Sequence, residues 1–67
     1  MDMIPVVSSN VASIGYENGK IEVLFRSGYI YQYPNCNEQL FQEFLNASSK
    51  GKFLNRYLKG TGETRIC

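Results

Sequence analysis

The sequence predicts an α+β fold, in which a three-stranded antiparallel β-meander is followed by two helices packed on one face of the sheet. Two observations lead to this prediction. Between residues 11 and 33, apolar side chains alternate with other residues, which is the period of a half-buried strand. Between residues 40 and 58, apolar residues recur every three or four positions within two segments, which is the period of an amphipathic helix. The expected order of elements is β-β-β-α-α.

The chain has 67 residues, which suits one small domain over residues 1–67 with a thin core. Hydrophobic residues make up 43% of the sequence, enough for a folded core. The first residues carry no basic region and no long apolar run, so we expect neither a signal peptide nor a membrane span, and a cytoplasmic location. Residues 1–10 are interpreted as an extended lead-in that can pair at an edge of the sheet.

The first two predicted strands form a hairpin. Asn18-Gly19 is the dipeptide most favoured in a two-residue type I′ turn, and it lies between two alternating segments. With these two residues as the loop, apolar side chains face one another across the strands. The expected pairs are Tyr16 with Ile21, Ile14 with Val23, and Ala12 with Phe25.

A three-residue loop, Arg26-Ser27-Gly28, connects the second strand to the third, with Gly28 in the left-handed conformation. This register pairs Phe25 with Tyr29, Val23 with Tyr31 and Ile21 with Tyr33. The three alternate tyrosines then share one face of the sheet. Core packing beneath the helices is the favoured interpretation, because it buries a large apolar area. The alternative is an exposed platform that stacks RNA bases.

Two amphipathic helices follow Pro34, which ends the third strand. Asn35 or Asn37 can cap the first helix, and Ser48 or Ser49 can cap the second. Gly60 is expected to end the second helix, and a loose tail follows it. The apolar stripes consist of Leu40, Phe41, Phe44 and Leu45 in the first helix and Phe53, Leu54, Tyr57 and Leu58 in the second.

Catalytic and metal-binding chemistry is not indicated. The chain has no histidine and no pair of acids spaced for a shared site, so we do not expect an enzyme. Cys36 and Cys67 lie far apart in sequence with no histidine to complete a zinc site, and no cofactor is indicated. Cys36 is interpreted as a half-buried residue near the start of a helix.

Charge is distributed unevenly along the chain. Residues 1–47 hold two basic and five acidic residues, a net charge of −3. Residues 48–67 hold five basic residues and one acid, a net charge of +4. The basic end is therefore a candidate contact surface for an anion.

The segment Ser48-Ser49-Lys50-Gly51-Lys52 is the most specific part of this basic end. Free N–H groups at a helix start, a glycine and two lysines together favour a phosphate site. Arg56 and Lys59 extend the positive charge along the second helix. The alternative is a solvated basic face, which is the more common role of a run of charges.

The sequence resembles the KTSC domain family, whose mark is a central Tyr-x-Tyr motif, here Tyr31-Gln32-Tyr33. The resemblance extends from residues 8–16 through 21–28 to 49–56, and so covers nearly the whole chain. Asn37 departs from the family pattern, which commonly has proline at this helix start. The positions that match recurrent family residues are Tyr31, Tyr33, Lys50, Gly51, Asn55 and Arg56.

The resemblance implies a domain that occurs at the C-terminus of some lysyl-tRNA synthetases and as small free-standing bacterial and phage proteins. RNA binding is a suggestion attached to the family, and no catalytic residues come with it. We therefore expect a non-enzymatic module that binds RNA or another polyanion. A module that binds a protein, such as a phage or bacterial accessory factor acting on a host protein, is the competing hypothesis. The expected RNA or anion site consists of Lys50, Gly51, Lys52, Asn55, Arg56 and Lys59.

Overall fold

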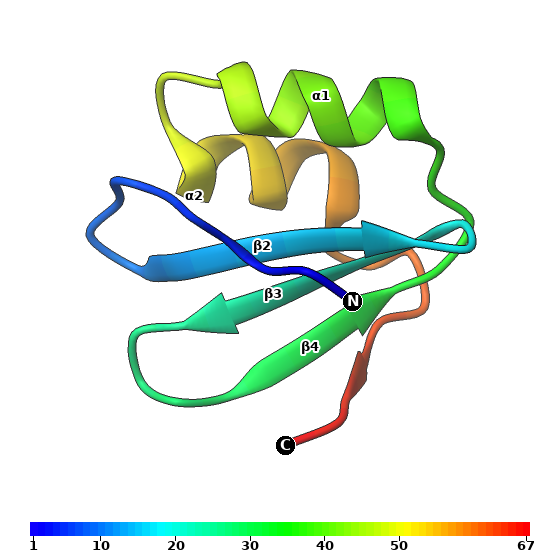
Figure 1. The fold of residues 1–67 in the computed structure, drawn as a ribbon, viewed down its shortest axis with the longest axis horizontal. Coiled ribbons are helices and arrows are strands. Elements are labelled where there is room, and N and C mark those ends of the chain that lie inside the picture. The colour runs from blue at the N-terminus through cyan, green and yellow to red at the C-terminus, as the bar shows by residue number, and fades with distance from the viewer.

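The computed structural model describes residues 1–67 as an antiparallel sheet with both helices on one face (Figure 1). This confirms the α+β class. The sheet has five strands in the order β1-β2-β3-β4-β5, and not the expected three. The elements are β1 (Ile4–Pro5), β2 (Val11–Glu17), β3 (Lys20–Phe25), β4 (Ile30–Tyr33), α1 (Glu38–Asn46), α2 (Lys50–Phe53), a π-helical turn η1 (Leu54–Leu58), and β5 (Thr64–Arg65).

The two additional strands lie at the edges of the predicted meander. β1 pairs with β2, with Ile4 opposite Ile14, and β5 pairs with β4, with Tyr31 opposite Arg65. The tail beyond Gly60, expected to be loose, thus forms part of the sheet. Each edge strand has only two residues, so neither shows the alternation that predicts a strand. Short edge strands also limit pairing with other chains.

The predicted hairpin register is confirmed over most of its length. Tyr16 lies opposite Ile21, and Ile14 lies opposite Val23. The register shifts between Val11 and Ser13, so Val11, and not Ala12, faces Phe25. This bulge points Val11 into the core, where its side chain is fully buried.

The second connection also forms as predicted. Gly28 has a φ of 98°, and its N–H donates to the carbonyl oxygen of Phe25 at 2.9 Å. The N–H of Phe25 donates in turn to Tyr29 at 2.9 Å. Tyr31 faces Val23 and Tyr33 faces Ile21, as expected.

Asn37 is the residue that caps α1, because its Oδ1 accepts a hydrogen bond from the N–H of Leu40 at 2.8 Å. Ser49 caps α2 in the same way. After α2 the helix widens into η1, where the N–H of Lys59 donates to the carbonyl oxygen of Leu54 at 2.8 Å. Gly60 follows with a φ of 85°, as expected for a helix stop. None of the helices has the length and hydropathy needed to span a bilayer.

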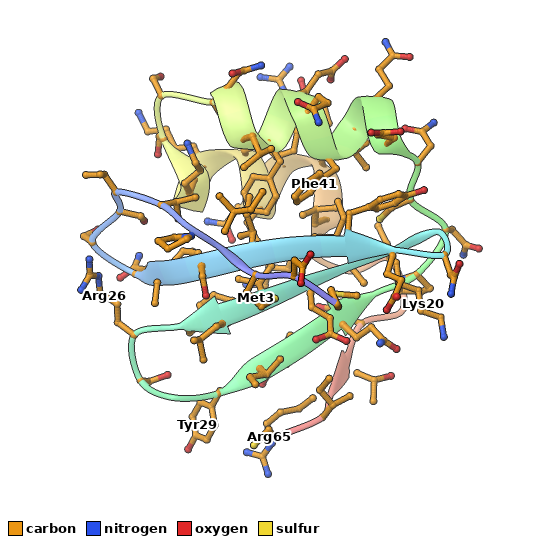
Figure 2. All side chains as sticks on the ribbon, viewed as in Figure 1. Met3, Lys20, Arg26, Tyr29, Phe41 and Arg65 are labelled. Carbon is orange, nitrogen blue, oxygen red and sulfur yellow. The ribbon has the colours of Figure 1, made fainter.

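The core lies between the sheet and the helices. It consists of Val11, Ile14, Ile21, Val23, Tyr33, Phe41, Phe44, Leu54 and Leu58. Tyr33 is buried in it, Tyr31 is half-buried, and Tyr29 is 49% exposed. The interpretation of the tyrosines as core residues is therefore correct for Tyr33 and wrong for Tyr29. Tyr29 precedes the first residue of β4, and Figure 2 shows it on the side of the molecule away from the helices, so its ring lies in solvent.

Candidate nucleic-acid interface

The start of α2 faces the loop before β2 across a polar cleft of about 400 Å³. Four of the six predicted site residues, Lys50, Gly51, Lys52 and Asn55, line this cleft. No carboxylate and no apolar side chain lines it. We call it the serine–lysine cleft, and its residues are Ser8, Ser9, Asn10, Ser48, Ser49, Lys50, Gly51, Lys52 and Asn55.

Arg26 holds the loop of residues 8–10 in place. Its Nε donates to the carbonyl oxygen of Ser8 at 2.7 Å, and its backbone N–H donates to Asn10 at 2.8 Å. The Ser8 hydroxyl oxygen accepts from the N–H groups of Asn10 and Val11, both at 3.3 Å. Arg26 lies at the end of the molecule where this loop turns (Figure 2), and it contacts Ser8, which lines the cleft, although Arg26 itself is not a lining residue. Sequence reasoning missed it because the contact spans 18 residues.

The two lysines of the cleft differ in their environment. Lys50 is half-buried, and its Nζ donates to the carbonyl oxygen of Ala47 at 2.6 Å. It therefore closes the turn between α1 and α2 as well as carrying charge. Lys52 is exposed, and its side chain makes no hydrogen bond within the chain. Lys52 is thus the freer of the two to meet a ligand.

The backbone at the start of α2 offers less to an anion than expected. The Oγ of Ser49 accepts from the N–H of Lys52 at 3.2 Å, and its carbonyl oxygen accepts from Phe53 at 3.1 Å. One of the N–H groups that were expected to be free, that of Lys52, is therefore occupied, whereas the N–H of Phe53 makes the first bond within the helix. Gly51 is not required for packing, because a Cβ there would meet only the Nδ2 of Asn10 at an ordinary 3.8 Å. The positive character of the cleft comes from its side chains.

The basic side chains are not neutralised by nearby acids. The chain has seven lysines and arginines, and none of them lies within 4.0 Å of a carboxylate oxygen. The one ion pair joins the N-terminal amine to Glu17 at 3.7 Å. Lys50 and Lys52, which line the cleft, and Arg26, which contacts its lining residue Ser8, are therefore positive charges without a paired acid.

Arg56 lies on an adjacent surface around the half-exposed ring of Tyr57. The Arg56 guanidinium carbon lies 5.6 Å from the centre of this ring. We call this surface the Tyr57 face, and its residues are Ala47, Ser48, Ser49, Lys52, Phe53, Arg56 and Tyr57. The sequence pattern placed Tyr57 in the apolar stripe. The wider turn of η1 changes the direction of the side chains within it, and Tyr57 is 50% exposed.

Lys59, the sixth predicted residue, lies apart from the cleft in a groove of about 420 Å³ between β4 and η1. Asn55 lines both hollows. We call this hollow the tyrosine groove, and its residues are Phe25, Ser27, Tyr29, Tyr31, Tyr33, Leu54, Asn55, Lys59 and Glu63. Unlike the cleft, the groove contains an acid.

The tyrosine groove has two groups with shifted pKa values. Burial, with a smaller contribution from the Glu63 charge, raises the pKa of Tyr33 to about 12. Backbone N–H groups of Glu63 itself, and then that of Gly60, hold the pKa of the Glu63 carboxyl below its usual value. The Gly60 N–H donates to both carboxylate oxygens, at 3.0 and 3.2 Å. Glu63 is therefore a fixed negative charge at this groove.

The cysteines are both free. Cys36 is half-buried, as predicted, and its Sγ lies 3.4 Å from the carbonyl oxygens of Tyr33 and Pro34. Burial raises the pKa of its thiol. Cys67 is exposed. No group of three or more His, Cys, Asp or Glu side chains is arranged to hold a metal ion.

Comparison with known proteins places this chain in a family. The KTSC domain model matches residues 7–61. An uncharacterized protein of Stutzerimonas stutzeri strain A1501 is 34% identical over 61 residues, which is 88% of this chain and 86% of that protein. The crystal structure of a KTSC domain protein from Yersinia pestis is 38% identical and superimposes with a TM-score of 0.92, over 98% of this chain and 97% of that one. The chain therefore belongs to the KTSC domain family.

Proposed function

We propose that this domain is a non-enzymatic module that binds RNA or another polyanion at the serine–lysine cleft. The observation that carries the proposal is the composition of the cleft: two lysines, a neighbouring arginine, several hydroxyl and amide groups, and no carboxylate. Phosphate oxygens accept hydrogen bonds from all of these donors, and lysine and arginine supply the long-range attraction. The family resemblance implies an occurrence at the C-terminus of some lysyl-tRNA synthetases, and RNA binding would suit that occurrence.

The test is a titration with short RNA at several salt concentrations. Three phosphate contacts, one for each cation, correspond to a slope of about −2 when log affinity is plotted against log salt for a single strand. Lys52→Glu weakens binding and lowers the magnitude of the slope by about 1. The single substitution is preferred to a double substitution of Lys50 and Lys52. Lys50 also donates a hydrogen bond to the carbonyl oxygen of Ala47, so its replacement would change the fold as well as the charge.

Lys20→Glu is the matched control. It makes the same charge change on an exposed lysine, at the β2–β3 hairpin (Figure 2). We expect it to keep most of the affinity, because Lys20 lines neither the cleft nor the Tyr57 face. Equal losses from the two substitutions would mean that only net charge matters, and the proposed site would be rejected.

The tyrosine groove supports the second candidate function, the binding of a protein partner. Its wall combines Phe25, Tyr29 and Leu54, and tyrosine and phenylalanine are enriched in protein interfaces. This alternative predicts no measurable association with random RNA near physiological salt. It also predicts that a host protein captured from nuclease-treated lysate is lost with Tyr29→Ala and kept with Lys52→Glu. The opposite pattern would favour the cleft.

A further inference from the structure

Tyr57 is an exposed aromatic ring held within a basic surface. Its ring centre lies 4.7 Å from that of Phe53, and Phe53 stacks on Phe44 at 5.1 Å with an interplanar angle of 13°. Phe44 is fully buried. Tyr57 is therefore the outermost of three rings that lead into the core, and this support limits its motion. A fixed ring loses little conformational entropy when another flat group stacks on it.

Cations surround the exposed part of the Tyr57 ring. Lys52 and Arg56 line the Tyr57 face, and no acid does. Arg56 lies over part of the ring, and the ring is 50% exposed, so a planar group can stack on the exposed part of the phenol next to the guanidinium. The two serines on the same face offer hydroxyl groups to a neighbouring polar group.

The Tyr57 face is continuous with the serine–lysine cleft. Ser48, Ser49 and Lys52 line both surfaces. A ligand with phosphates in the cleft therefore passes directly beside Tyr57. In a duplex, the base faces are covered by neighbouring base pairs, whereas in a single strand they are free to stack on a protein ring.

We propose that the Tyr57 face is a base-stacking site, so that the preferred ligand of this domain is single-stranded RNA and not duplex RNA. This inference rests on the proposed function, because the phosphates of the same strand occupy the serine–lysine cleft. Tyr57 and Arg56 stack with a base, and Lys52 lies between the base and the phosphates.

Binding of an eight-nucleotide single strand and of the matched duplex, measured by fluorescence anisotropy, tests the inference. Tyr57→Ala weakens binding of the single strand by about 5- to 150-fold, the usual effect of losing one stacking ring, and leaves binding of the duplex unchanged. Tyr57→Phe keeps the affinity, because the ring face remains. Thermal unfolding of each variant checks whether the fold is intact.

Tyr29→Ala is the matched control for Tyr57→Ala. Tyr29 is 49% exposed against 50% for Tyr57, and it also has an arginine over its ring, Arg65 at 5.0 Å. Its groove, however, contains the carboxylate of Glu63 beside Lys59, whereas the Tyr57 face has two cations and no acid. Tyr29→Ala therefore leaves binding of the single strand unchanged. Equal losses from the two variants would overturn the assignment to Tyr57.

A direct reading of stacking uses tryptophan emission. The chain has no tryptophan, so Tyr57→Trp and Tyr29→Trp each carry a single reporter. We expect the single strand to quench the emission at position 57 and not at position 29. One outcome separates the two proposals. If RNA binds and Lys52→Glu weakens the binding, but RNA does not quench the tryptophan at position 57 and Tyr57→Ala does not reduce the affinity, the stacking site is rejected and the proposed function is retained. If neither form of RNA binds, both proposals fail.

Discussion

Lys50 donates from its Nζ to the carbonyl oxygen of Ala47, at 2.6 Å, across the turn that joins α1 to α2. Ala47 follows the last residue of α1, where carbonyl groups have no partner within the helix. The lysine therefore satisfies an acceptor that would otherwise need water. This contact offsets the unfavourable position of a cation in the first turn of a helix.

Replacing Lys50 tests this contact. Lys50→Ala removes a hydrogen bond with a charged donor and lowers the free energy of unfolding by about 1–2 kcal/mol. Lys52→Ala, in the same turn but without a side-chain partner, changes it by less than about 0.5 kcal/mol. Urea unfolding followed by circular dichroism measures both. Equal effects would show that the contact with Ala47 contributes no stability.

The start of α1 depends on Asn37. Asn37→Ala removes the acceptor for the N–H of Leu40 and lowers the free energy of unfolding by about 1 kcal/mol. Asn37→Asp keeps an acceptor and retains most of the stability. Thermal unfolding of the two variants separates loss of the cap from a general effect of substitution. A destabilised Asn37→Asp would argue against the cap.

Gly51→Ala should stabilise the domain by about 0.5–1 kcal/mol, because glycine disfavours a helix and a Cβ there makes only ordinary contact with Asn10. The same change adds a methyl group to a residue that lines the serine–lysine cleft. An increase in stability together with weaker RNA binding would mean that the glycine serves the ligand and not the fold. Chemical denaturation and RNA titration on one preparation give both values.

Alkaline pH should destabilise the domain through Tyr33. Its pKa rises to about 12 in the folded state from about 10, so the folded chain retains a proton that the unfolded chain loses. The contribution of Tyr33 to stability is therefore complete below pH 10 and is lost between pH 10 and 12. Tyr33→Phe has no such proton, and its stability falls less over this range. If the free energy of unfolding depends on pH in the same way in both proteins, Tyr33 does not contribute as a buried phenol.

Local signals predicted the centre of the sheet, and long-range contacts decided its edges. Asn18-Gly19 and Gly28 set the two turns, and these turns fixed the register of β2, β3 and β4. The bulge at Ala12 is a single extra residue in an alternating run, so the sequence pattern does not show it. β1 and β5 are too short for any periodicity, and only pairing with their neighbours defines them.

The candidate site was likewise predicted only where local sequence signals define it. Residues close in sequence, Lys50 to Asn55, were placed together because one helix carries them. Arg26 and residues 8–10 reach the cleft through tertiary contacts that no spacing in the sequence shows. Tyr57 was assigned to the apolar stripe on α-helical periodicity, whereas η1 has a wider turn.

The strand β5 has a further consequence for any shortened form of this chain. Ile66 donates its N–H to Ile30 at 2.8 Å, and Ile30 donates its own to Cys67 at 3.3 Å. A fragment ending where the family match ends, at residue 61, loses these bonds and leaves the outer side of β4 with unsatisfied backbone groups. Two such fragments can pair their exposed β4 strands edge to edge. The last six residues therefore cover an edge that would otherwise favour self-association.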